Sequence, residues 1–396
     1  MRRSTGFFLG LILLAAAGIR AEYTFFSPSG SFAVEVSLEN SSLLRLPIYR
    51  NAITSLEVSG DYALGGTSAA PGLSPFLFAV SLSRRRLELA VDLAQIIPEQ
   101  RAVISGFGRG PGGVLYAGTM SDSPGGSGHL IQVRIKEPSL VVLDLGVPVD
   151  KEGVFAVASD PGRRAIYGIS HPSGKFFAHD LASRTTRVFV ETVPSRQTLG
   201  FLHGYAVKPE DYLSRRLILD GKGRVFGSLP VSRLFRFDPG NQKVEILPDQ
   251  IPEVWGRRPL GRVDSWARSA DGSLYGGNAG DGQLFRVDPD KAKVENLGKP
   301  VMMPRIKGLA FGGDGKLYGV GGASPGYAHL FSFDPKGGGF SDLGNPRFTM
   351  VAPGIEQGIS WRGFRIGTVA ASEDGRFIVL GEEEALSQLM VFPVHP

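Results

Sequence analysis

One pattern of residues recurs along this chain at intervals of about 45 to 50 residues. Residues 269–298 and 312–344 share, in the same order, Asp-Gly, Leu-Tyr-Gly, Leu-Phe, Asp-Pro and a closing Leu-Gly. A third copy, residues 220–247, keeps Asp-Gly, Phe-Gly, Leu-Phe and Asp-Pro. Repetition at this period is typical of folds that repeat one supersecondary unit. The sequence therefore constrains the fold much more strongly than the function.

Each copy has the pattern of four short strands joined by turns. In the copy that starts at Arg262, the predicted strands are residues 263–267, 274–277, 284–287 and 294–297. The dipeptide Asp288-Pro289 lies between the third and fourth strands, where Asp followed by Pro favours a type I turn. One such sheet cannot bury both of its faces alone. Radial stacking of several sheets supplies the missing cover and gives a β-propeller.

The copies can be counted from one landmark in the second strand of each: Leu64, Tyr116, Tyr167, Phe226, Tyr275, Tyr318 and Ile378. The sequence thus predicts an all-β, seven-bladed β-propeller of four-stranded antiparallel blades, with six or eight blades as the alternatives. The blades are expected at about residues 56–94, 101–146, 153–193, 213–247, 262–298, 305–344 and 365–394. Segment 31–39 alternates apolar and polar residues, and we expect it to pair with residues 388–392 and close the ring.

The N-terminus has the pattern of a signal peptide. Arg2-Arg3 precedes an apolar run at residues 7–17, and residues 18–21 follow as a short c-region that ends in Ala21, with Ile19 at the −3 place. The run is shorter than the ~20 apolar residues that a membrane span needs. We expect a signal peptide at residues 1–21, with cleavage after Gly18 as the alternative, and a single propeller domain at residues 22–396. The lack of cysteine excludes disulfides and suits a secreted or periplasmic bacterial protein.

The net charge argues against a nucleic-acid partner. Loss of residues 1–21 would leave 40 basic against 38 acidic residues, which is close to neutral. Neither a His-Glu-x-x-His pattern nor a phosphate-binding Gly-Lys-Ser/Thr pattern occurs. We expect no metal, no cofactor, no membrane span in the mature chain, and a monomer.

Arginines recur at one position of the repeat. Arg262, Arg305 and Arg365 each stand 13 residues before the landmark of their copy, and Arg101 stands near the same place in the second copy. This position is the start of the inner strand. The four side chains could form a partial basic ring at one funnel mouth, where the guanidinium fork suits a carboxylate or sulfate. The alternative is that each arginine pairs with an acidic neighbour such as Asp264 and stiffens the junction between blades.

Aromatic residues are expected near the same mouth. Trp255 and Trp361 lie in long connections between blades, and Tyr327 lies in a loop between second and third strands. Exposed rings beside charged groups suit the C–H faces of sugars; alternatively, each Trp fills a gap between blades. We interpret Trp266, inside an inner strand, as structural.

Two histidines are candidates for chemistry. His171 lies in a loop on the same predicted face, and His203 lies in a long connection next to Gly204 and Tyr205. With Tyr205 or Tyr327, either could supply the base and acid that remove the proton beside a uronate carboxylate, while an arginine neutralises that carboxylate. Chance proximity of His and Tyr is the alternative.

The copies resemble those of bacterial seven-bladed propellers, a set that includes quinoprotein, kelch, YVTN/NHL-type and polysaccharide-lyase propellers. The phrase LFRVDPDK at residues 284–291 is similar to a quinoprotein blade, but the Trp that closes that motif is missing. Two functions remain open. One is a secreted propeller that binds an anionic carbohydrate or a partner protein on its funnel face. The other is a polysaccharide-active enzyme, a uronate-directed lyase.

Overall fold

The structure is a computed structural model that describes residues 24–36, 52–191, 201–202, 205–206, 212–230, 232–253, 261–322, 327–351, 357–383 and 388–395. These residues form strands and turns, with two 3-10 turns, η2 (Leu93–Gln95) and η3 (Pro111–Gly113), and no α-helix. The all-β prediction is confirmed. Within this part of the chain, no helix is long and apolar enough to cross a membrane. The predicted signal peptide lies outside the described residues.

The strands follow one another through antiparallel sheets in chain order. One sheet contains β3 (Ala52–Ser59), β4 (Tyr62–Ser68), β5 (Phe76–Ser81) and β6 (Arg86–Asp92). The next contains β7 (Gln100–Val103), β8 (Gly108–Arg109), β9 (Leu115–Ser121), β10 (Leu130–Lys136) and β11 (Ser139–Gly146), and the single pair Ser68↔Ala102 joins it to the first. A third contains β12 (Gly153–Asp160), β13 (Ala165–His171), β14 (Lys175–Asp180) and β15 (Thr185–Glu191).

The second half of the chain continues in the same way. Its sheets contain β18 (Ile218–Leu219), β19 (Val225–Leu229), β20 (Arg233–Asp238) and β21 (Lys243–Gln250); β22 (Val263–Arg268), β23 (Leu274–Asn278), β24 (Leu284–Asp288) and β25 (Lys293–Gly298); and β26 (Ile306–Phe311), β27 (Leu317–Gly321), β28 (His329–Asp334) and β29 (Gly339–Thr349). The last sheet contains β31 (Ile366–Ala371), β32 (Phe377–Glu382) and β33 (Gln388–Pro393).

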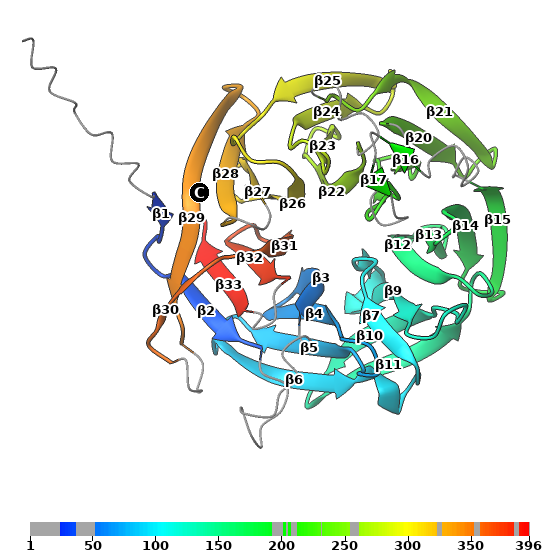
Figure 1. Ribbon diagram of the computed structural model, residues 1–396, viewed down its shortest axis with the longest axis horizontal. Coiled ribbons are helices and arrows are strands. Elements are labelled where there is room, and N and C mark those ends of the chain that lie inside the picture. Colours follow the sequence, from blue (N-terminus) through cyan, green and yellow to red (C-terminus); the bar gives the residue numbers. More distant parts are fainter. Residues whose placement is uncertain are drawn as a thin grey trace, which may run out of the picture.

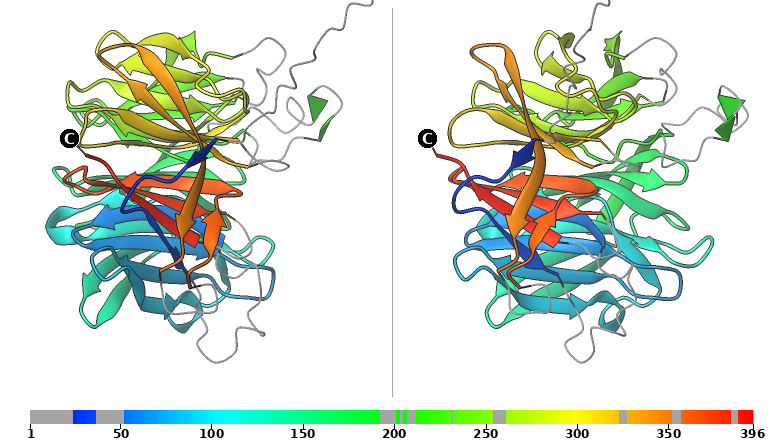
Figure 2. Two further views of the ribbon diagram at one scale, coloured as in Figure 1. Left: turned by 90° about the vertical axis from the view of Figure 1, so that its left-hand side faces the viewer. Right: turned by 60° about the vertical axis from the view of Figure 1, so that its left-hand side comes forward.

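The sheets stand around a common axis (Figure 1). The strands β3, β12, β22 and β31 lie nearest the axis, and β6, β11, β15, β21 and β25 lie on the outside. A short hairpin of β16 (Phe201–Leu202) and β17 (Tyr205–Ala206) pairs only with itself and stands apart from the sheets (Figure 2). The inner strands therefore bring residues from distant parts of the sequence together around one axis.

A glycine and a phenylalanine on neighbouring strands explain the repeated Tyr-Gly and Leu-Phe dipeptides. Gly276 of β23 is directly opposite Phe285 of β24, whose ring is fully buried. A Cβ at Gly276 would lie 2.3 Å from that ring, so only glycine fits beneath it. The same cross-strand arrangement occurs at Gly65 with Phe78, Gly168 with Phe177, Gly227 with Phe235 and Gly319 with Phe331. Each repeat thus specifies the packing inside its own sheet.

The N-terminal segment joins two different sheets. β2 (Phe32–Glu35) is antiparallel to β33, with Phe32 opposite Val391. The side chains of Phe32, Ala33 and Val34 are 0–1% exposed. β1 (Phe25–Phe26) lies parallel to β29, which also pairs with β30 (Ser360–Arg362). The last sheet of the chain therefore gains its fourth strand from near the N-terminus.

Candidate functional site

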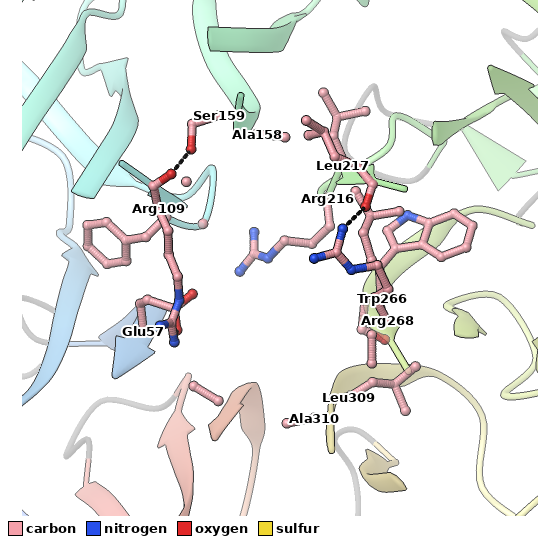
Figure 3. Close-up of a pocket in the computed structure, with 18 of the residues that line it drawn as sticks. Glu57, Arg109, Ala158, Ser159, Arg216, Leu217, Trp266, Arg268, Leu309 and Ala310 are labelled. Carbon is pink, nitrogen blue, oxygen red and sulfur yellow. Dashed lines mark hydrogen bonds and ion pairs between the residues drawn. The ribbon is translucent and has the colours of Figure 1, made fainter. Parts of the chain in front are cut away.

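A cavity of about 1030 Å³ lies along the axis, between the inner strands. It is lined by residues of β3, β8, β12, β18, β22, β26 and β31. Its open end lies at the turns that follow these strands, where Pro161, Lys222 and Glu373 are exposed. Figure 3 shows Arg216, Trp266 and other lining residues around this space. A concave space with a few convergent polar groups is the usual form of a small-molecule site.

The inner strands carry a β-bulge at the same place, near their start. The extra residue is Thr54 in β3, Asp264 in β22 and Lys307 in β26, and β12 and β31 have the same irregularity. A bulged residue is left out of the strand pairing, so its side chain does not follow the alternation of side chains between the two faces of the sheet. All three of these residues line the inner end of the cavity or the small space beneath it. The bulges thus place charged side chains inside the channel.

Charged side chains close the inner end of the cavity. Lys307 Nζ donates to the carboxylate of Glu383, which also lies 3.6 Å from Arg215 Nη2 and 3.7 Å from Arg365 Nε. Burial alone would raise the pKa of Glu383, but the charges of Lys307 and Arg215 lower it far below its usual value. Glu383 therefore stays ionised and holds three cations from different sheets together.

Arg216 enters the cavity from the segment before β18 (Figure 3). Its guanidinium donates to three backbone carbonyls, those of Ile104 at 2.9 Å, Arg215 at 2.9 Å and Thr54 at 3.2 Å. Within the described part of the chain it has no ion pair with a carboxylate. Burial and the neighbouring charge of Arg215 lower the pKa of Arg216 to about 10, so it remains a cation at neutral pH. Arg216 is thus a recessed positive charge that a bound anion would neutralise.

Trp266 and Arg268 follow Asp264 along β22 and also line the cavity. Trp266 is half-buried, with its ring edge-on to Phe285 at 5.6 Å. Arg268 is exposed and donates to the carbonyl of Leu219 at 3.2 Å. The sequence predicts a structural role for Trp266 from its place in an inner strand; the packing on Phe285 suits that role, and the residue also lines the cavity wall (Figure 3). The wall thus combines an aromatic surface with two guanidinium groups.

A cluster of charged residues lies at one side of the cavity (Figure 3). Arg109 lies 2.7 Å from Glu57 of β3 and 2.8 Å from Glu373, which follows β31. Burial raises the pKa of Glu57, although the adjacent Arg109 opposes that shift. Glu57 is therefore a carboxylate of the wall that takes up a proton more readily than a carboxylate in water.

The predicted ring arginines lie at the other end of the inner strands. Arg262 is buried and forms an ion pair with Asp264 at 3.0 Å, and Arg365 lies beside Glu383. Arg305 and Arg101 are partly exposed. None of the four lines the cavity. For Arg262 and Arg365 the contacts agree with the alternative interpretation, in which the arginines are occupied by acidic neighbours.

The predicted aromatic and histidine residues lie in separate places. Trp361 Nε1 donates to Glu382 at 2.7 Å, while the ring of Tyr327 packs against Phe364 at 5.2 Å. His171 packs against the buried Phe155 of the neighbouring strand β12 at 5.4 Å, in the sheet of β12 to β15. Trp255, His203 and the side chain of Tyr205 lie outside the described residues. His171 ends β13 and Tyr327 precedes β28, so these two residues come from different sheets.

No protein-family model and no curated protein matches this sequence. Among solved structures, streptogramin B lyase is similar, with a TM-score of 0.59 and 10% identity over 89% of this chain and 96% of that one. The Swd1 β-propeller domain from Myceliophteria thermophila has a TM-score of 0.57 and 10% identity, over 92% of this chain and all of that one. The fold is that of a β-propeller. The extracellular domain of BT4673 from B. thetaiotaomicron is also similar, with a TM-score of 0.58 and 14% identity over 92% of this chain and 40% of that one.

The sequence contained a signal for the charged residues of the propeller channel. Arg215, Asp264 and Lys307 each stand eleven residues before the landmark of their copy, and Asp264 and Lys307 stand two positions after the predicted ring arginines Arg262 and Arg305. Three consecutive copies therefore carry a charge at one equivalent position. Comparing the copies at this position would have found the residues that close the cavity.

Proposed function

We propose that this propeller is an exported binding protein whose central cavity binds an anionic carbohydrate. The observation that carries the proposal is Arg216, a recessed guanidinium that lines the cavity and whose hydrogen bonds to the described residues all go to backbone carbonyl oxygens. A carboxylate or sulfate would accept two hydrogen bonds from this planar group. Trp266 supports a sugar as the carrier of that anion, since an indole face packs well against the C–H surface of a sugar ring.

The proposal includes the organisation of the chain. Residues 1–21 would be removed on export, and residues 22–396 would form one ring of seven blades, closed by β2. The pairing of β2 with β33 and the sequence of sheets from β3 to β33 support this organisation.

Arg216→Met tests the anion contact. We expect the affinity for a uronate oligosaccharide, measured by isothermal titration calorimetry, to fall about 100-fold, because a charge-assisted pair contributes about 1.5–3 kcal/mol. Arg216→Lys keeps the charge but loses the fork and should fall about tenfold. Arg163→Met is the matched control: Arg163 also lines the cavity but is paired with Asp160 at 2.8 Å. An equal loss in both Met variants, or no loss in either, would refute the assignment of Arg216.

Gly106→Ala tests the same contact without removing the guanidinium. A Cβ at Gly106 would lie 2.9 Å from Arg216 Nε, so the arginine must move. We expect about tenfold weaker binding, which corresponds to about 1.4 kcal/mol. Gly72→Ala is the control, because its φ of 78° matches the 76° of Gly106 but no atom lies within 4 Å of the added Cβ. Both variants should lose similar stability through backbone strain; equal affinities would contradict the role of Arg216.

Binding should strengthen as the pH falls from neutral toward about 4.3, the ordinary pKa of a Glu carboxylate. Since the pKa of Glu57 is raised, this carboxylate takes up a proton at a higher pH than an ordinary glutamate. The cavity wall then loses a negative charge. A sugar carboxylate, with an ordinary pKa of about 3.5, stays ionised over this range. We expect a several-fold gain in affinity for the wild-type chain and a flat profile for Glu57→Gln. A wild-type affinity that falls over the same range would contradict this prediction.

A further inference from the structure

We infer that the cavity takes only the end of an anionic chain, or a free small sugar acid, and not an internal stretch of a polymer. This inference rests on the proposed function and names its substrate class. It follows from the shape of the cavity, which has an open end and a closed end, and from the position of the positive charge at the closed end.

The closed end leaves no path for a sugar ring. Asp264 and Lys307 line it, and these residues are 3% and 5% exposed. Beneath them, between Thr54, Arg215 and Glu383, the remaining space is about 10 Å³. A single water molecule needs about 10–15 Å³. A polymer could therefore not thread through the described part of the channel.

The closed end is also held rigidly. Glu383 follows β32 and contacts Lys307 of β26, Arg215 of the segment before β18, and Arg365 before β31. Opening a passage would separate Lys307 and Glu383, whose side chains are 3% and 15% exposed, and leave both charges without their partner, which is costly. A sugar chain would not open the channel at the expense of these contacts.

The order of side chains along the wall gives the direction of the ligand. Arg216 lies beside Asp264 and Lys307, around the closed end, whereas Trp266 and Arg268 lie progressively further along β22 toward the mouth. Residues two apart on a strand are separated by about 6.6 Å, which is close to the size of one sugar ring. The acid group would thus enter first and reach Arg216, while its ring lies against Trp266 and the rest of the chain leaves through the mouth near Arg268.

The test is calorimetric titration of the full mature chain with uronate oligosaccharides of one to six units and with their polymer. We expect the affinity of an oligosaccharide to increase with its length and to become constant at about three or four sugar units. The polymer should bind no more than one protein at each chain end that fits the cavity. Capping the chain end that enters the cavity with a bulky group should weaken binding more than 100-fold. Capping the opposite end of a long chain should change the affinity less than about threefold.

The outcomes separate the two proposals. Several proteins bound along one polymer chain, or full affinity for a polymer capped at both ends, would overturn the chain-end inference and leave the proposed function standing, provided that Arg216→Met still weakens binding. If neither uronates nor sulfated sugars of any length bind, the proposed function fails, and this inference fails with it.

Discussion

Deletion of residues 22–39 is expected to destabilise the protein by more than about 5 kcal/mol or to make it insoluble. The deletion removes β2 and with it three buried side chains, and it leaves β33 as an exposed edge strand. Urea unfolding followed by circular dichroism would measure the loss. Phe32→Ala alone should cost about 3–5 kcal/mol, whereas Phe25→Ala in β1, where the ring is 37% exposed, should cost less. Unchanged unfolding of the truncated chain would show that β2 does not close the ring.

Glu383→Gln is expected to have the second largest effect on stability, about 3–5 kcal/mol, because it leaves buried cations without their shared carboxylate. Thermal or urea unfolding at pH 7 would measure it. Glu373→Gln is the matched control: this carboxylate also pairs with an arginine but is 60% exposed, so its loss should cost less than about 1 kcal/mol. Similar costs for both variants would contradict the account of the closed end.

The same variant gives a pH dependence with a definite sign. The folded-state pKa of Glu383 is lowered, so its stabilising contribution is fully present above the unfolded pKa of about 4.3 and is lost as the pH falls through the lower folded value. The difference in stability between wild type and Glu383→Gln should therefore be largest near neutral pH and shrink below about pH 4. A difference that grows on acidification would contradict the assigned charge state.

The sequence was sufficient to predict the sheets because local residues specify them. The Gly276–Phe285 pair and its equivalents are internal to one sheet, and Asp288 accepts the backbone N–H of Asp290 in the predicted turn at 3.0 Å. These contacts join residues that are close in sequence and repeat with the copies. The order of the strands could thus be read from the repeat alone.

The alternation of residues along single strands did not predict the site, because a β-bulge interrupts that alternation in each inner strand that forms the cavity's closed end. The pattern pointed to Arg262 and Arg305, whereas the bulge turns Asp264 and Lys307 into the channel. The place of Trp266 in the cavity wall could not be predicted for a related reason: an apolar residue in an inner strand suits both a core and a cavity wall, and this residue contacts both. Arg216 lies in a connection between sheets, and its contacts with Ile104 and Thr54 join residues far apart in sequence.

The central claim is that an anionic sugar binds in the cavity through Arg216, and a crystal structure of the mature chain with a uronate disaccharide tests it most directly. The account predicts a carboxylate within hydrogen-bond distance of the Arg216 guanidinium and a sugar ring against Trp266, reached from the mouth near Arg268. A disaccharide bound instead at the opposite end, beside Arg305 and Arg101, or an empty cavity at a saturating ligand concentration, would contradict it.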